Sequence, residues 1–110
     1  STILILGITY KRDVADCRES PALDIMRLLR VKGPRLCYHD PHIACLDLDG
    51  ELLNSVELTV SVLREADCTI IVADHSAYDW QWIVQNARLI VDTRNATRSV
   101  QLSGARIIKL

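Results

Sequence analysis

Apolar runs of strand length recur along this chain, and each is followed by a polar stretch. Thr2–Leu6 is a continuous apolar run, which is typical of a strand covered on both faces in a parallel sheet. Residues 68–73 are β-branched and apolar throughout and give a second strand pattern. Further strands are predicted at residues 35–38, residues 88–91 and Arg106–Lys109.

The first helix is predicted from Pro21 to about Lys32, with Ser20 as its N-cap. Proline suits the first helical position, where a missing N–H has no cost. Gly33 and Pro34 end the helix, because glycine favours the position after the last turn and proline bars continuation. The helix has a core-facing stripe with the spacing i, i+3, i+4, i+7, made up of Ala22, Ile25, Met26 and Leu29.

Two shorter helices are predicted at residues 61–66 and 78–86, the second with Trp82 and Ile83 facing inward. Trp80 and Trp82 are expected to pack this helix rather than stack on a ligand. Residues 43–56 show no clear period and contain several turn-forming residues, so we expect a loop there.

Strands that alternate with helices predict a doubly wound α/β fold. We expect a mostly parallel, Rossmann-like sheet of about five strands with helices on both faces, in one domain of 110 residues. In such a sheet, the polar residues that follow the strands gather along one edge, where ligands bind. Four clusters are expected there: residues 10–18, 39–42, 74–76 and 92–94.

The net charge, the lengths of the apolar runs and the cysteine spacing restrict the class of partner. A net charge of −1 gives no support for general nucleic-acid or membrane-surface binding, so any anion site must be local. No apolar run reaches the length of a membrane span, and no signal peptide is visible. The four cysteines form no CxxC pair, which argues against a zinc or thioredoxin-type site and favours reduced thiols in a cytoplasmic protein. The chain opens on a serine and enters its first strand at once, so we expect a piece of a longer polypeptide.

Gly7 follows the first strand alone, without the G-x-G-x-x-G pattern that closes a backbone around a pyrophosphate. Any phosphate must therefore be held by side chains, for which Lys11, Arg18 and Arg94 are suited. The charged stretch at 10–18 also leads into a helix N-terminus, a usual place for an anion. The alternative is an ordinary solvated connection, in which these cations pair with nearby acids: Asp13, Asp16 and Glu19.

Other candidate residues carry weaker signals. Asp40 follows the second strand, where nicotinamide domains place a ribose-binding acid, but a turn-forming Asp-Pro is the favoured interpretation. His39, His42 and His75 are not spaced as metal ligands, and capping or surface roles are favoured. Cys17 lies beside cations that could lower its pKa, but no adjacent base is evident to activate it as a nucleophile.

Four segments together resemble one family: LGITYKRDVADCRESPALDIMRLL, YHDP, TIIVADHSAYDW and LIVDTRNATR. They are similar to the C-terminal UDP-binding domain of the UDP-glucose/GDP-mannose dehydrogenase family, the nucleotide-sugar 6-dehydrogenases. The pattern K-x-D-x-x-D-x-R-E-S-P, from Lys11 to Pro21, is a specific signature of it. The resemblance covers nearly the whole chain in order, except for residues 43–61.

The resemblance implies a three-part, homo-oligomeric enzyme of polysaccharide biosynthesis, with an N-terminal NAD-binding domain and a central dimerisation segment outside this chain. Such enzymes oxidise a sugar C6 alcohol to a carboxylate in two NAD-dependent steps, through a cysteine thiohemiacetal and thioester. Their catalytic cysteine lies in a G-x-C segment that this chain lacks, and Cys17 does not match it. We therefore expect no catalytic residue, no metal ligand and no dehydrogenase activity in the isolated domain.

Carried over by position, the resemblance implies that Tyr10, Lys11 and Arg94 contact the UDP-sugar and that Arg18 faces the NAD. The segments DHSAYDW and VDTRNATR are most similar to members acting on UDP-N-acetylglucosamine, with UDP-glucose and UDP-N-acetylmannosamine as alternatives. A stand-alone, non-catalytic nucleotide-binding or interaction module is the rival from another class. A phospho-accepting receiver domain is excluded, because Leu6 and Gly7 supply no acid pair at the end of the first strand.

Overall fold

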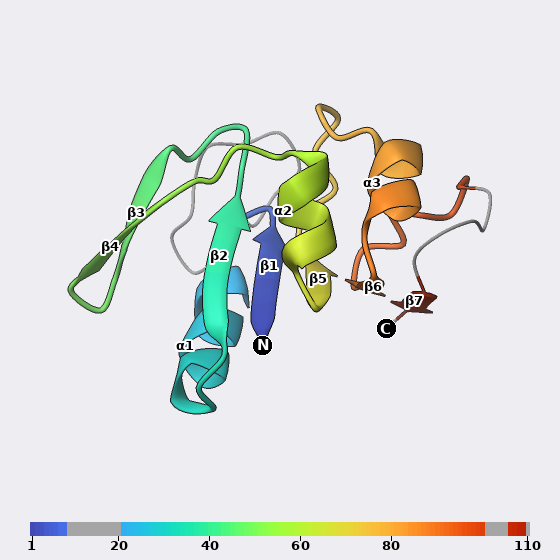
Figure 1. The fold of residues 1–110 in the computed structure, drawn as a ribbon. Coiled ribbons are helices and arrows are strands. Elements are labelled where there is room, and N and C mark those ends of the chain that lie inside the picture. Colours follow the sequence, from blue (N-terminus) through green and yellow to red (C-terminus); the bar gives the residue numbers. More distant parts are fainter. Residues whose placement is uncertain (9–20, 101–105, 110) are drawn as a thin grey trace.

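The computed structural model describes residues 1–8, 21–100 and 106–109. A five-stranded parallel sheet runs through them in the order β2-β1-β5-β6-β7 (Figure 1). β1 pairs on both sides, so that Leu4 lies opposite Cys37 of β2 and Thr69 of β5. The predicted parallel sheet is confirmed, with these strands: β1 Thr2–Leu6, β2 Arg35–His39, β5 Cys68–Ile71, β6 Leu89–Asp92 and β7 Arg106–Lys109.

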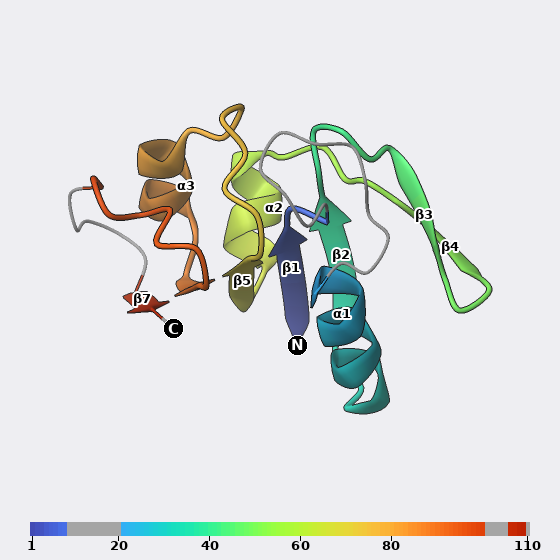
Figure 2. The ribbon, with the colours of Figure 1, turned by 180° about the vertical axis from the view of Figure 1, so that it is seen from behind.

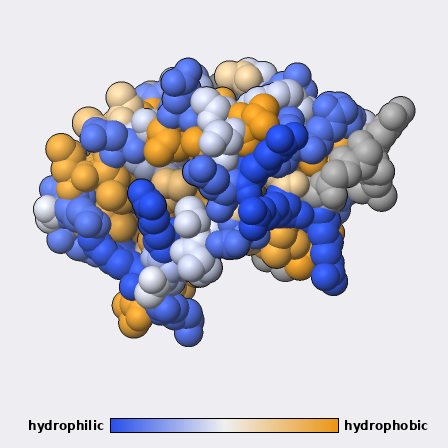
Figure 3. Space-filling view, viewed as in Figure 1, coloured by the Kyte–Doolittle hydropathy of each residue, from blue (hydrophilic) through white to orange (hydrophobic). Residues whose placement is uncertain are grey.

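Helices cover both faces of the sheet, as predicted. α1 (Pro21–Val31) packs on one face, and α2 (Val60–Glu65) and α3 (Trp80–Asn86) pack on the other, as the two opposite views show (Figures 1 and 2). None of the helices in the described residues is long and apolar enough to cross a membrane. On the face that carries α2 and α3, polar residues cover much of the surface, with apolar patches between them (Figure 3).

Two hydrophobic clusters lie on either side of the sheet, because successive residues of each strand point to opposite faces. Ala22 and Met26 of α1 are fully buried against Ile5 of β1 and Tyr38 of β2. On the other face, α2, α3 and the strands contribute buried aliphatic side chains: Leu4, Leu6, Leu63, Ile83, Val84 and Ile90. Burying such a side chain stabilises the fold by about 1.5–3 kcal/mol, so these clusters hold the helices on the sheet.

Helix ends follow their sequence signals. Gly33 has a φ of +94° just beyond α1, which confirms its predicted role in ending that helix. Thr59 caps α2 by accepting the Val62 N–H, and Asp79 caps α3 by accepting the Trp82 N–H at 3.1 Å. Trp82 of α3 packs against the apolar cluster on that face of the sheet, as predicted. The predicted cap Ser20 lies outside the described residues.

The loop predicted for residues 43–56 is wrong. This segment contains an antiparallel hairpin, β3 (Cys45–Leu48) and β4 (Glu51–Asn54), which projects from the sheet (Figure 1). Asp49 and Gly50 form its two-residue turn with φ values of +53° and +93°, the conformation that an Asp-Gly pair favours. Leu46 and Leu48 alternate with exposed residues and pack on the α1 side of the core.

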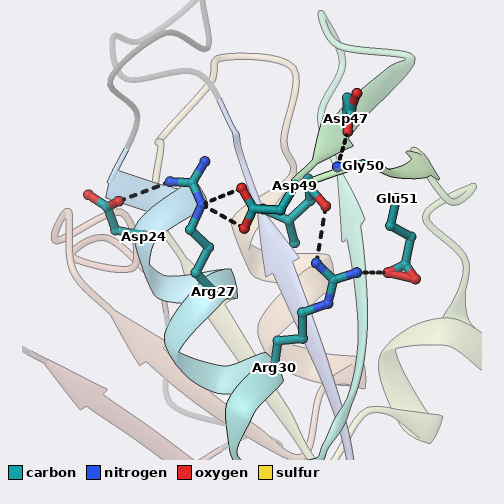
Figure 4. A network of polar contacts seen from close by, with 8 residues as sticks. Asp24, Arg27, Arg30, Asp47, Asp49, Gly50 and Glu51 are labelled. Carbon is teal, nitrogen blue, oxygen red and sulfur yellow. Dashed lines mark hydrogen bonds and ion pairs between the residues drawn. The ribbon is translucent and has the colours of Figure 1, made fainter.

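Two arginines of α1 hold the hairpin (Figure 4). The Arg27 Nε donates to both carboxylate oxygens of Asp49 at 3.2 and 3.1 Å. Arg30 donates to the Leu48 carbonyl at 3.0 Å and also to the Glu51 carboxylate. The hairpin is therefore attached to α1 by side chains, in addition to its buried leucines.

Candidate functional site

The carboxyl edge of the parallel sheet gathers the polar clusters that the sequence predicts. Residues 39–42, 74–76 and 92–94 lie at or just after the carboxyl ends of β2, β5 and β6, and side-chain contacts join them. The fourth cluster, with the predicted site residues Tyr10, Lys11 and Arg18 and with Cys17, lies outside the described residues. Arg94 is the predicted site residue whose position the structure describes.

Gly7 lets the chain leave β1 in close contact with the neighbouring strands. Its N–H donates to the His39 carbonyl at 2.9 Å, and its φ is +88°. A Cβ at this position would lie 2.7 Å from the Cβ of Ala73, a separation that real side chains do not adopt. Position 7 therefore requires glycine, because of its positive φ and because of the close approach of Ala73. β5 ends at Ile71, two residues earlier than predicted.

Asp40 ties the ends of β1 and β2 together. Its buried carboxylate accepts the Ile8 N–H at 2.6 Å on Oδ2 and the His42 N–H at 2.7 Å on Oδ1. The second bond is that of an Asx turn, which confirms the turn role predicted for this Asp-Pro pair. Both oxygens serve the backbone, so the carboxylate does not fit the role of a ribose-binding acid.

The surface or capping role predicted for His75 is wrong. Its side chain is completely buried, and its Nε2 lies 3.4 Å from Asp40 Oδ2. The imidazole is also packed edge-on against His42, with ring centres 4.9 Å apart. The partner of the buried His75 is the Asp40 carboxylate, 35 positions away in the sequence, so no local sequence pattern indicates this burial. No group of three His, Cys, Asp or Glu side chains in the described residues could hold a metal ion.

Tyr78 completes the buried polar contacts at this edge. Its hydroxyl donates to the His39 carbonyl at 2.9 Å and lies 3.0 Å from His39 Nδ1. Burial, reinforced by the negative charge of Asp40, raises the pKa of the Tyr78 phenol. Burial also lowers the pKa of His39, against the opposing charge of Asp40. The neutral forms of Tyr78 and His39 are therefore favoured.

Asp92, at the end of β6, organises the loop that carries Arg94. Its carboxylate is fully buried and accepts the backbone N–H groups of Arg94, Ala96 and Thr97 and the Thr97 hydroxyl, at 2.7–3.1 Å. Burial alone would raise the pKa of Asp92, but these hydrogen bonds outweigh it and lower the pKa below its usual value. The loop is therefore fixed by a charged acceptor.

Arg94 extends from this fixed loop with its side chain 45% exposed. Its Nε lies 3.7 Å from Oδ1 of Asp74, which follows β5. Thr93 joins the two strands by donating its hydroxyl to the Ile71 carbonyl at 2.6 Å. The sequence placed Asp74 in the edge cluster but gave no sign that it faces Arg94.

The described residues include three cysteines, two of which do not have the environment of a nucleophile. Cys37 and Cys68 are half-buried, Cys45 is exposed, and all three are free thiols. Burial raises the pKa of Cys37, against the nearby positive charge of Arg35, and it also raises the pKa of Cys68. These two environments disfavour the thiolate that a nucleophile needs.

Comparison with known proteins identifies the domain type. Residues 4–99 match the UDP binding domain of the UDP-glucose/GDP-mannose dehydrogenase family. A UDP-N-acetyl-D-mannosamine dehydrogenase of Methanococcus maripaludis is 33% identical over 69% of this chain and 16% of its own length. A UDP-glucose 6-dehydrogenase of Rickettsia bellii is 31% identical over 88% of this chain and 24% of its own length. The chain thus spans a quarter or less of these relatives.

Solved structures share the fold over nearly the whole chain. The UDP-N-acetyl-mannosamine dehydrogenase of Staphylococcus aureus is 28% identical, with a TM-score of 0.71 over 96% of this chain and 26% of that one. An NDP-N-acetyl-D-galactosaminuronic acid dehydrogenase of Methanosarcina mazei superposes with a TM-score of 0.74 over 99% of this chain and 24% of that one, and at 22% identity it supports the fold alone. The chain therefore belongs to the UDP-glucose/GDP-mannose dehydrogenase family, through the UDP binding domain that residues 4–99 match.

Proposed function

We propose that this chain is the UDP-sugar-binding domain of an NAD-dependent nucleotide-sugar 6-dehydrogenase. The match of residues 4–99 to the family's UDP binding domain is the observation that carries the proposal. The half-exposed Arg94 at the carboxyl edge supports it, because a guanidinium is suited to the phosphate oxygens of UDP. In this proposal Tyr10, Lys11 and Arg94 contact the UDP-sugar.

Two features of this chain support placing the main NAD site elsewhere. Gly7 has no further glycines of a dinucleotide pattern after it, and both Asp40 oxygens already accept backbone N–H groups. We therefore assign NAD mainly to an N-terminal domain outside this chain, with Arg18 facing it across the cleft. The catalytic cysteine is likewise assigned to that other part, in a homo-oligomeric cytoplasmic enzyme that oxidises the sugar C6 alcohol to the carboxylate.

The substrate proposed first is UDP-N-acetylglucosamine, on the segments DHSAYDW and VDTRNATR. Relatives named for UDP-N-acetyl-D-mannosamine and for UDP-glucose support the wider class of UDP-hexoses. NADH formation by the longer polypeptide that carries this domain, measured with all three UDP-sugars, decides between them. Activity with UDP-glucose alone would contradict the N-acetylhexosamine proposal.

Arg94→Ala tests the binding assignment in the same polypeptide. We expect the KM for UDP-sugar to rise at least tenfold while the KM for NAD changes little, since one or more charge-assisted hydrogen bonds are lost. Arg88→Ala is the matched control, because it removes an exposed arginine at the opposite end of β6. A larger effect on NAD than on UDP-sugar would refute the assignment. If residues 1–110 alone formed NADH, the assignment of the NAD site and the catalytic cysteine to a part outside this chain would be refuted.

A further inference from the structure

Two Asp–Arg pairs join β5 and β6 at their opposite ends. Asp67 and Arg88 precede the two strands, and their Oδ1 and Nη1 atoms lie 3.5 Å apart. Asp74 and Arg94 follow the same strands, with Oδ1 and Nε 3.7 Å apart. The first pair is 50–63% exposed, whereas the Asp74 side chain is only 18% exposed. The pair at the carboxyl edge is therefore the one with a largely desolvated acid.

The Asp74 carboxylate needs a donor. Its Oδ1 is buried and has no hydrogen-bond partner among the described residues, and a buried carboxylate oxygen without one is costly. Arg94 Nε, at 3.7 Å, lies just beyond hydrogen-bond distance. A small rotation of the Arg94 side chain would bring Nε into hydrogen-bond distance of this oxygen. The negative charge of Asp74 therefore draws the guanidinium toward Asp74 Oδ1.

The backbone leaves Arg94 little freedom apart from its side-chain rotations. Its N–H donates to Asp92 at 3.0 Å, and the next residue, Asn95, has a φ of +55°. A guanidinium carries five N–H donors, of which an approach through Nε uses one. The four donors on the terminal nitrogens then remain for an anion.

We propose that Asp74 is a positioning residue, which holds the Arg94 guanidinium at the carboxyl edge so that its terminal nitrogens can bind the diphosphate of a nucleoside diphosphate. This inference rests on the proposed function, and it assigns to Asp74 a role in ligand affinity rather than in the fold. Asp74 makes no contact with the phosphate itself, because like charges would repel.

The test is a titration of UDP into the ¹⁵N-labelled 110-residue chain, followed by NMR. Asp74→Ala should weaken UDP binding about tenfold, the value of one misplaced charge-assisted hydrogen bond. Asp74→Asn, which keeps an acceptor oxygen, should weaken it less. In the Arg94→Ala background, Asp74→Ala should have no further effect. The Nε–Hε signal of Arg94 should broaden in Asp74→Ala, while that of Arg88, at the opposite edge, stays unchanged.

The outcomes separate the inference from the function on which it rests. If Arg94→Ala weakens UDP binding but Asp74→Ala leaves both the affinity and the Arg94 signal unchanged, the positioning role is overturned. An Asp74→Ala effect that persists without Arg94 also overturns it. If UDP causes no shift in the wild-type chain, or if Arg94→Ala leaves its binding intact, the proposed UDP contact fails, and the positioning role fails with it.

Discussion

The backbone of Gly7 packs so closely against Ala73 that a methyl group at position 7 would lie 2.7 Å from the Ala73 Cβ and 2.8 Å from its nitrogen. This contact joins the point where the chain leaves β1 to the point where it leaves β5. The residues after both strands are thereby held at one edge of the sheet, where Asp40 and His75 also meet.

Gly7→Ala should lower the free energy of unfolding by about 3 kcal/mol, through overpacking and the cost of a positive φ. Gly33→Ala is the matched control, because Gly33 has a similar φ of +94° but nothing within 4 Å of an added Cβ. It should cost only about 1 kcal/mol, the conformational part of the effect. Urea unfolding of both variants provides the measurement. Equal losses in the two would show that Ala73 can yield.

Asp92→Asn should destabilise the chain by about 3 kcal/mol at neutral pH, because it replaces a charged acceptor of four hydrogen bonds. The pKa of Asp92 is lower in the folded state than in the unfolded state. Its contribution to stability is therefore present above the unfolded pKa of about 3.9 and is lost as the pH falls through the folded value. The wild type should lose stability in acid more steeply than the variant, as denaturation at a series of pH values would show.

The exposed Asp24 provides a control for simple charge removal. Asp24→Asn should change the stability by less than about 0.5 kcal/mol at neutral pH, since its ion pair with Arg27 is solvated. Parallel acid profiles for the wild type and Asp92→Asn would contradict the role given to the buried carboxylate.

Tyr78→Phe should cost about 1 kcal/mol at neutral pH, the value of its hydrogen bond to the His39 carbonyl. The pKa of Tyr78 is raised in the folded state, so its contribution is full below the unfolded pKa of about 10 and is lost as the pH rises through the folded value. As the pH rises above the unfolded pKa of tyrosine, the wild type should therefore lose stability more steeply than Tyr78→Phe. An identical alkaline dependence in both proteins would mean that Tyr78 ionises as freely as in the unfolded chain.

Arg30→Ala should loosen the β3–β4 hairpin while lowering global stability by only about 1 kcal/mol. It removes the bonds to the Leu48 carbonyl and to Glu51, both of which belong to the hairpin. Hydrogen exchange should therefore accelerate in residues 45–54 and remain unchanged in β1 and β5. Arg27→Ala, which removes exposed ion pairs to Asp49 in the turn and to Asp24, should have a smaller effect. Uniform acceleration over the whole sheet would show that the hairpin is not a separate unit.

The sequence predicted the sheet strands and helices well because their signals are local. Thr2–Leu6 is apolar throughout, and the α1 stripe has a helical period, so each could be read within a few residues. The hairpin was missed because β3 and β4 are largely exposed and lack the apolar runs that marked the equally short β5 and β6, although Asp49-Gly50 is itself a hairpin signal.

The site was predictable only in outline. The rule that polar residues after parallel strands share an edge placed the cluster of Asp74 and that of Arg94 together, and the contact between these residues confirms it. The partners of individual side chains were not predictable. The burial of His75 depends on Asp40, and the importance of Asp74 depends on Arg94, each far away in sequence.

β1 is bonded on both sides, to β2 and to β5, so the sheet depends on pairing between segments far apart in the sequence. Among the described strands β2 pairs with β1 and β1 with β5, so the hydrogen-bonded path from β2 to the β5–β6–β7 half of the sheet runs through β1. Ile3 meets Cys68 across 65 residues, a long-range contact that is slow to form. A nascent chain can complete β1–β2 early, but its remaining edge stays open until β5 emerges. During that interval the unpaired edge of β1 is open to pairing with another chain, which is a route to aggregation.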